Sequence, residues 1–203
     1  MAFTDDFTGT DGDLLESRTG WTKEVDGLYK LDVYSNGLAS RSDGSGSGRS
    51  LYVCTDQASN SHYSQCKFPA ANSSTELVAW AVDQDNYLCL YFSGTGSIGA
   101  KMAQRVAGTR STLLQVSGAS GASQAWKIEV DASAQEAEFF LDDVSQGAAS
   151  DVSALTQDSS QGLVAGAAVG NTKLIDDFEA DALGAAGISI PVVQHHRQQQ
   201  GAH

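Results

Sequence analysis

The sequence predicts an all-β fold in which antiparallel strands form a two-sheet sandwich, followed by an extended C-terminal tail. Apolar residues recur mostly at every second position, in short runs broken by Gly, Ser, Asn and Asp, as in half-buried antiparallel strands. The 203 residues include 21 glycines and two prolines, a composition that favours many tight turns. Almost no segment shows the apolar period of an amphipathic helix.

The alternation predicts thirteen short strands. We expect two stacked sheets, because an open twisted sheet of that width usually curls or splits. Polar segments at 40–50 and 145–162 are expected to be loops, with one short helical turn at 152–155. In chain order, the expected strands are residues 3–7, 28–34, 38–41, 50–55, 62–68, 76–82, 87–93, 98–105, 112–116, 125–131, 136–141, 162–169 and 173–179.

The chain divides into a domain at residues 1–180 and an arm at residues 181–203. The arm has small residues, a short apolar stripe and then a glutamine-rich end with one permanent positive charge. So short a segment buries too little area to order itself alone, so we expect it to dock on a neighbouring subunit, with a frayed terminus as the alternative. Its candidate assembly residues are Ile188, Ile190, Val192, Val193 and Arg197.

The overall charge limits which kinds of partner the protein can bind. The chain has 12 Lys and Arg against 25 Asp and Glu, a formal charge of −13, which repels nucleic acid. The start MAFTDDFTGT has neither a basic nor an apolar signal region, and no apolar run is long enough for a membrane span. We therefore expect synthesis in a cytoplasm and no membrane insertion. Cys54, Cys66 and Cys89 read as reduced buried residues, with a Cys54–Cys66 disulfide or a reactive thiol left open.

Four stretches carry a family resemblance: DDFTGTDGDLL, YLCLYFSGTGSIGAKMAQRVAGTRSTLL, AWKIEVDASAQEAEFFLDDV and GLVAGAAVGNTKLIDDFEA. Their order and turn placement resemble the concanavalin A-like lectin/glucanase superfamily in its laminin G-like branch, over residues 3–180. The resemblance implies an antiparallel jelly roll whose first and last strands are neighbours. The matching segments FTDDFTG and LIDDFEA would then lie side by side.

Adjacent Asp-Asp pairs in those two strands would bring like charges together, which is destabilising. A register offset, a bulge at each pair, or a bound cation would relieve the repulsion. The resemblance implies a structural calcium as one possibility, and aspartates hydrogen-bonded to nearby backbone as the other. The candidate ligands are Asp5, Asp6, Asp176 and Asp177.

The sequence gives no sign of catalysis. Glu129 and Asp131 resemble the Glu-x-Asp start of the acidic strand motif of laminarinase-like glucanases, but the third acid is absent. Alternation places Trp126, Ile128 and Val130 inside and these acids outside, and no second catalytic carboxylate can be placed. The four histidines have no zinc spacing or nucleophile motif. We therefore expect no enzymatic activity.

Tyrosines are the candidate ligand-binding groups. If Leu51, Val53, Cys66, Phe68, Leu88, Leu90 and Phe92 point into the core, Tyr52, Tyr63, Tyr87 and Tyr91 point to the opposite face and could line a concave sheet. Sugars stack on such rings and bond their hydroxyls. The alternative is that a loop, a subunit or the arm covers them. Trp21, Trp80 and Trp126 are expected in the core or packed at a sheet edge.

These features lead to three functional hypotheses. Similar domains occur on bacteriophage capsids and tails, so the first is a non-enzymatic virion protein, a capsid decoration, cement or fibre-like surface protein. It would be made in the host cytoplasm without a signal peptide, form a homo-oligomer, contact other virion subunits and could bind a cell-surface glycan. The second is a bacterial carbohydrate-binding module or lectin. The third is a polysaccharide-degrading enzyme.

Overall fold

The computed structural model describes residues 2–42, 48–54, 59–70, 75–92, 99–117, 124–149, 151–166 and 172–184. The fold class is the one predicted, and the 3-10 turn η1 (Leu15–Ser17) is the one helical element in these ranges. The strands are β1 (Phe3–Asp5), β2 (Trp21–Val25), β3 (Tyr29–Val33), β4 (Leu38–Ser42), β5 (Ser50–Cys54), β6 (His62–Lys67), β7 (Thr75–Asp83), β8 (Asn86–Phe92), β9 (Gly99–Val106), β10 (Thr109–Ser117), β11 (Ala125–Asp131), β12 (Glu136–Leu141), β13 (Val144–Ala149), β14 (Gly162–Ala165) and β15 (Asp176–Ala182).

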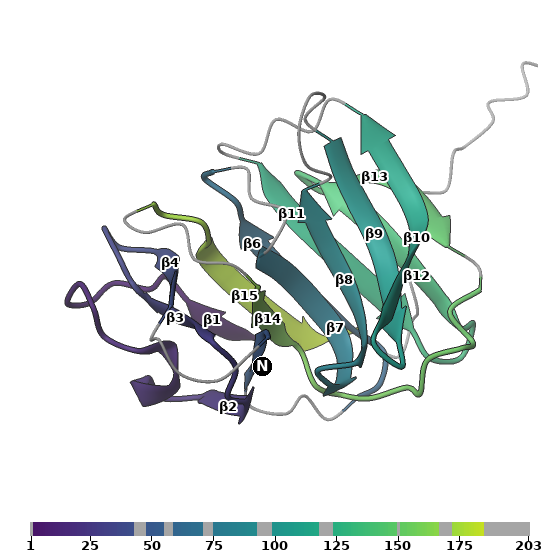
Figure 1. Ribbon diagram of the computed structural model, residues 1–203. Helices are drawn as coiled ribbons and strands as arrows, with labels where there is room; N and C mark the ends of the chain where they lie inside the picture. The colour runs from purple at the N-terminus through teal and green to yellow at the C-terminus, as the bar shows by residue number, and fades with distance from the viewer. Residues whose placement is uncertain are drawn as a thin grey trace, which may run out of the picture.

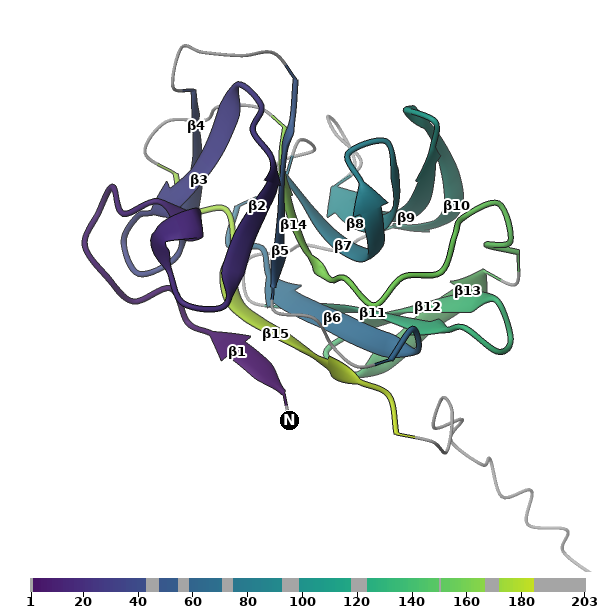
Figure 2. The ribbon, with the colours of Figure 1, turned by 90° about the horizontal axis from the view of Figure 1, so that it is seen from below.

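The strands form two stacked antiparallel sheets and a separate hairpin (Figures 1 and 2). One sheet has six strands in the order β1-β15-β6-β11-β12-β13, and the other has seven in the order β10-β9-β8-β7-β14-β5-β2. The hairpin β3-β4 lies at the end of the sandwich that carries β1 and β2 (Figure 1). This is the sandwich that the alternating sequence predicts.

The first and last described strands are neighbours, as predicted. Strand β1 pairs antiparallel with β15, and Asp5 lies opposite Phe178 rather than opposite an aspartate. The register of β15 on β6 shifts between Asp176 and Glu179, and Asp177 has a φ of 48°. A register offset and a bulge therefore separate the two Asp-Asp pairs, which removes the direct repulsion.

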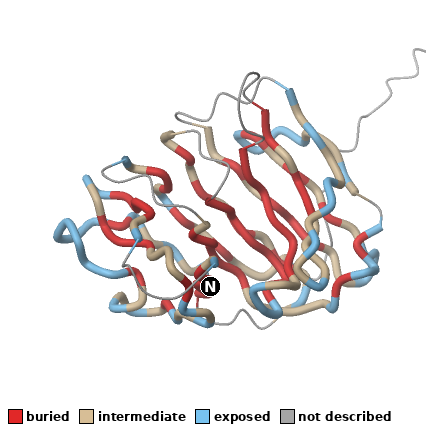
Figure 3. The backbone as a smooth tube through the Cα atoms, in the orientation of Figure 1, coloured by how far each residue is buried: buried red, intermediate tan, exposed pale blue. Residues whose placement is uncertain are grey.

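The main core lies between the two sheets, where buried residues follow the strands (Figure 3). Trp21, Trp80 and Trp126 all belong to it, as predicted. The ring of Trp126 lies 4.5 Å from that of Phe92 and 5.1 Å from that of Phe68, centroid to centroid. Such tilted and edge-on aromatic contacts stabilise the core beyond the area they bury.

A second apolar cluster covers the opposite face of the seven-stranded sheet. Its central strands are therefore buried on both faces: all residues of β5 and β14 are buried. This cluster, called the outer cluster below, consists of Leu51, Val53, Val78, Ala81, Tyr87, Cys89, Tyr91, Ala103 and Val164.

Two observed strands were not predicted. Strand β2 has Lys23 at a position between its two apolar ends, and β13 is made largely of small and polar residues, so neither has a clear apolar alternation. Strand β15 also extends to Ala182, beyond the predicted domain end at residue 180. The residues 185–203, which include most of the predicted arm, lie outside the described ranges.

The three cysteines are buried and form no disulfide, which confirms the first of the alternatives above. Burial raises the pKa of the Cys66 and Cys89 thiols well above the ordinary value, so they are poor nucleophiles. Within the described residues, no helix has the length and apolar character needed to cross a membrane.

His62 of β6 is fully buried, and its Nδ1 lies 3.2 Å from the carbonyl oxygen of Ser59. Its Nε2 has no hydrogen-bond partner among the described groups. Burial is the main cause that lowers the pKa of His62 from 6.5 to about 4. The folded protein therefore holds this imidazole neutral at pH values where the unfolded chain protonates it.

We expect the free energy of unfolding to fall by about 1.4 kcal/mol per pH unit as the pH drops from 6.5 toward 4, because the unfolded state takes up the proton first. Above pH 6.5 this contribution is constant. Urea unfolding of the natural chain and of His62→Gln at several pH values measures it as the difference between the two curves. Curves that run parallel between pH 7 and pH 5 would contradict the assignment.

Candidate functional site

The outer face of the six-stranded sheet carries polar side chains in regular order. Residues of β6 alternate between buried and half-buried, so Tyr63, Gln65 and Lys67 point away from the core. The strand register aligns outward side chains of β1, β15, β6, β11 and β12 in one line, at the strand spacing of about 4.8 Å. This line, called the polar row, is Thr4, Glu179, Gln65, Lys127 and Phe140.

A hollow of about 480 Å³ lies at the β1 end of the polar row. Thr4, Gln65 and Glu179 of the polar row line it. Its other charged side chains are Asp5, Asp6, Lys67 and Asp177, so three of the four predicted metal ligands do gather at one place. The hollow offers hydroxyl, amide, carboxylate and ammonium groups to a polar ligand.

Each of these aspartates nevertheless has partners of its own. Asp5 accepts hydrogen bonds from the guanidinium of Arg18, from Trp21 Nε1 at 2.9 Å and from the backbone N–H of Phe7 at 2.8 Å. Asp6 accepts from the backbone and side chain of Thr8, which lowers its pKa. These donors give both carboxylates hydrogen-bond partners without a metal ion.

The two aspartates at the start of β15 are paired with lysines. Asp176 lies 2.7 Å from Lys173 Nζ, and Asp177 lies 2.6 Å from Lys67 Nζ. Within the described ranges, no three acidic, histidine or cysteine side chains converge as a metal site requires. The predicted calcium ligands Asp5, Asp6, Asp176 and Asp177 therefore do not fit a calcium ion in this arrangement. Basic side chains pair with Asp5, Asp176 and Asp177, and Thr8 donates to Asp6.

The hydrogen-bond partners of Asp5 predict that replacing Asp5 destabilises the fold more than replacing Asp6. Replacing Asp5 by Ala leaves Arg18 and Trp21 Nε1 without their acceptor, and we expect a loss of about 2–3 kcal/mol in the free energy of unfolding. The adjacent, exposed Asp6 is the matched control, and Asp6→Ala should change the free energy of unfolding by about 0.5 kcal/mol or less. Chemical denaturation measures both, and equal losses would contradict the described geometry.

Tyr63 is the one predicted ligand-binding tyrosine on this face. Its hydroxyl donates a hydrogen bond to Glu179 of the polar row. Burial and then this carboxylate raise the pKa of Tyr63, which stays protonated. Lys127 Nζ lies 5.9 Å from the ring centroid of Tyr63 and 4.7 Å from that of Phe140. An ammonium group thus lies between two half-buried rings.

The four tyrosines do not share one face, contrary to the prediction. Tyr52 belongs to the main core, and its hydroxyl accepts a hydrogen bond from the backbone N–H of Leu31 at 3.2 Å. Tyr87 and Tyr91 belong to the outer cluster on the seven-stranded sheet. The prediction fails at β5, where Leu51 and Val53 point outward and Tyr52 inward, because both faces of that strand are buried.

The structure places a second carboxylate beside Glu129, for which the sequence showed none. Glu129 of β11 and Glu138 of β12 lie directly opposite each other in the strand register. Trp126, Ile128 and Val130 point into the core, so both glutamates are on the outer face, as predicted for Glu129. Glu129 lies 3.1 Å from Lys127 Nζ. A pair formed between two strands has no signature in one continuous motif, which is why the sequence did not show it.

The predicted assembly residues Ile188, Ile190, Val192, Val193 and Arg197 lie outside the described residues. Their role in assembly stays a prediction.

Comparison with known proteins shows the fold. No protein-family model and no curated protein matches the sequence. Among solved structures, the carbohydrate-binding module CBM66 from Bacillus subtilis is 18% identical with a TM-score of 0.54, covering 81% of this chain and 93% of that one. A β-1,3-1,4-glucanase (lichenase) derived from a mouse hindgut metagenome is 12% identical with a TM-score of 0.55, covering 90% and 99%. A structure described as a native glycosidic hydrolase is 13% identical with a TM-score of 0.54, covering 88% and 94%.

These likenesses confirm the two-sheet jelly-roll fold and bear on two expectations. The expectation that the protein is not an enzyme is wrong on this comparison, because two of the three structures are glycan hydrolases. None of the three is a virion protein, so the bacteriophage hypothesis gains no support from them, and one of the three is a carbohydrate-binding module. At these identities the shared property is the fold.

Proposed function

We propose that this protein binds carbohydrate along the outer face of the six-stranded sheet. The polar row carries this proposal. It presents a hydroxyl at Thr4, a carboxylate at Glu179, an amide at Gln65, an ammonium at Lys127 and a ring at Phe140, in that order. At a strand spacing of about 4.8 Å, the five side chains extend over about 19 Å.

Such a row suits a ligand that repeats hydroxyl groups along its length. Sugar hydroxyls both donate and accept, so acceptor and donor side chains in succession can bind neighbouring hydroxyls of one chain. Phe140 at the far end offers an apolar ring for the face of a sugar. The hollow of about 480 Å³ at the other end lies within the size range of small-ligand sites.

The fold is consistent with this use. A carbohydrate-binding module and two glycan hydrolases have the same architecture. Fold likeness alone does not identify the ligand or the site, so the proposal depends on the polar row.

The proposal predicts that Gln65→Ala and Phe140→Ala weaken binding of a neutral oligosaccharide. We expect about threefold to tenfold loss for each, which corresponds to one lost hydrogen bond or ring contact. Calorimetry with cello-, laminari- and fructo-oligosaccharides measures it. Gln115→Ala is the matched control, since Gln115 is an exposed glutamine on β10 of the other sheet. If Gln115→Ala weakens oligosaccharide binding as much as Gln65→Ala does, this site is contradicted.

A second candidate function is glycoside hydrolysis, and one observation favours it. Directly opposite residues in neighbouring antiparallel strands have Cβ atoms about 4.5–5.5 Å apart on the same face, so two glutamate carboxyl groups there can reach a similar separation. Retaining glycosidases use two carboxyl groups about 5–5.5 Å apart. Glu129 and Glu138 are such a register pair on the face that carries the polar row.

If the pair is catalytic, Glu129→Gln and Glu138→Gln should each reduce the release of reducing sugar from β-glucan at least a hundredfold while leaving oligosaccharide binding intact. A reducing-sugar assay and calorimetry on the same preparations separate the two effects. Glu24→Gln on β2 is the control, because Glu24 is an exposed glutamate of the other sheet. No release by the natural chain, together with measurable binding, would leave carbohydrate binding as the function.

A further inference from the structure

The outer cluster of the seven-stranded sheet contains a buried ionic group. Glu76 of β7 is fully buried, yet it points to the outer face of the sheet among apolar residues. Its Oε1 accepts hydrogen bonds from Arg49 Nη1 and, at 2.7 Å, from Arg110 Nη1. Its Oε2 accepts a bond of 2.8 Å from the hydroxyl of Tyr87, to which Arg49 Nη1 also donates at 3.1 Å.

The charges in this cluster do not balance. One carboxylate is paired with two guanidinium groups, which leaves a local surplus of one positive charge on a chain of formal charge −13. Lys101 lies opposite Tyr91 and Arg105 opposite Tyr87 in the register of β9 and β8, and both tyrosines belong to the outer cluster. Four of the chain's 12 basic residues are therefore gathered on this one face.

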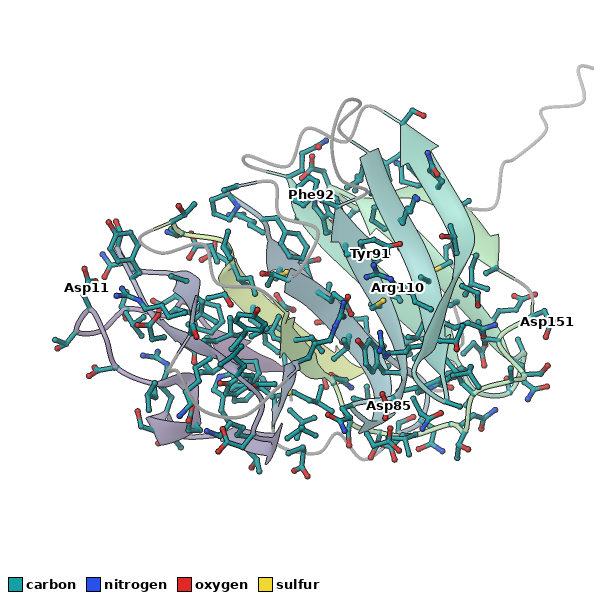
Figure 4. The ribbon with its side chains drawn as sticks, viewed as in Figure 1. Asp11, Asp85, Tyr91, Phe92, Arg110 and Asp151 are labelled. Atoms are coloured by element: carbon teal, nitrogen blue, oxygen red, sulfur yellow. The ribbon has the colours of Figure 1, made fainter. Side chains whose placement is uncertain are left out.

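The two arginines are held in place and reachable from solvent. Arg110 lies over the ring of Tyr91, 4.0 Å from its centroid, and Figure 4 shows the two side chains next to each other. The side chain of Arg49 is 25% exposed and that of Arg110 is 28% exposed, whereas Glu76 is 0% exposed. Each guanidinium has five N–H donors, and the bonds to Glu76 and Tyr87 use those of Nη1.

This geometry favours a particular ligand chemistry. Guanidinium groups recognise carboxylate and sulfate oxygens through paired N–H donors, and a group fixed in advance by a ring and an ion pair loses little freedom on binding. The negative field of the whole chain disfavours long polyanions such as nucleic acid. A short ligand with one or two anionic groups fits both conditions.

We propose that Arg49 and Arg110, held by Glu76 and Tyr91 on the outer face of the seven-stranded sheet, form a second binding site that takes an acidic saccharide through its carboxylate or sulfate group. The saccharide part of this assignment rests on the proposed carbohydrate-binding function. The anionic part rests on the arginine pair alone.

Calorimetric titration of the full chain tests it with four probes: trigalacturonate, a chondroitin sulfate disaccharide, neutral cellotriose and sodium sulfate. We expect at least one acidic saccharide to bind at least tenfold more tightly than both cellotriose and sodium sulfate. A preference for trigalacturonate identifies the carboxylate as the recognised group, and a preference for the disaccharide identifies the sulfate.

Variants locate the site. Arg110→Gln should weaken binding of the acidic saccharide at least tenfold. Arg110→Lys keeps the charge and the pairing with Glu76, and it should weaken this binding at least threefold because the fork geometry of the guanidinium is lost. Arg41→Gln is the matched control, since Arg41 also pairs with a carboxylate, Asp32, and lies 5.6 Å from the ring centroid of Tyr34 on the separate hairpin. Should Arg110→Gln fail to fold, Arg110→Lys decides the result.

Three results would overturn the inference: equal affinity for acidic saccharide and cellotriose, equal affinity for acidic saccharide and sodium sulfate, or equal loss in Arg41→Gln and Arg110→Gln. If the protein binds neutral oligosaccharide, Gln65→Ala weakens that binding and acidic saccharide is not preferred, this inference is wrong and the proposed function is supported. Acidic binding that depends on Arg110, without any neutral binding, would support this site and contradict the polar row.

Discussion

The pairing of the first strand with the last constrains the whole six-stranded sheet. Strand β15 lies between β1 and β6, so the sheet is complete only when residues near both ends of the chain have met. Closing a loop of that length costs chain entropy before any contact is gained. The aromatic contacts of Phe3, Trp21 and Phe178 and the partly buried hydrogen bonds of Asp5 offset this cost at one place. The β1 end of the polar row depends on this pairing, which fixes Thr4 opposite Glu179.

Acidic residues at that junction show how a highly negative chain can pack its strands. The carboxylates of Asp5, Asp176 and Asp177 are each paired with a basic side chain, and the bulge at Asp177 turns one acid out of line. Sequence could predict the conflict, because two Asp-Asp-Phe segments were expected to be neighbours. It could not predict the solution, since Arg18 and Lys67 are far along the chain from the acids they bind.

Alternation predicted the faces of β6 and β8 correctly but not those of β5. In β6 and β12, buried and half-buried residues alternate strictly, and the predicted inward residues such as Cys66 are in the core. In β5 every residue is buried, so the segment SLYVC contains no exposed position to mark a face. Tyr52 was assigned outward for that reason. Register pairs such as Glu129 with Glu138 are invisible for a different reason, because they depend on which strands become neighbours.

The two outer faces differ in a way that bears on function. On the six-stranded sheet the outward polar side chains of the polar row are partly exposed, so they lose little hydration on folding. On the seven-stranded sheet Glu76 is fully buried, and a buried carboxylate with its two arginines is generally no more stabilising than apolar residues of similar volume. The neighbouring outer-cluster positions Val78, Cys89 and Ala103 show that this face readily accepts apolar side chains. An ionic cluster set among them contributes little that packing alone would not, so its exposed guanidinium groups, rather than its contribution to stability, are the physical reason to expect a ligand there.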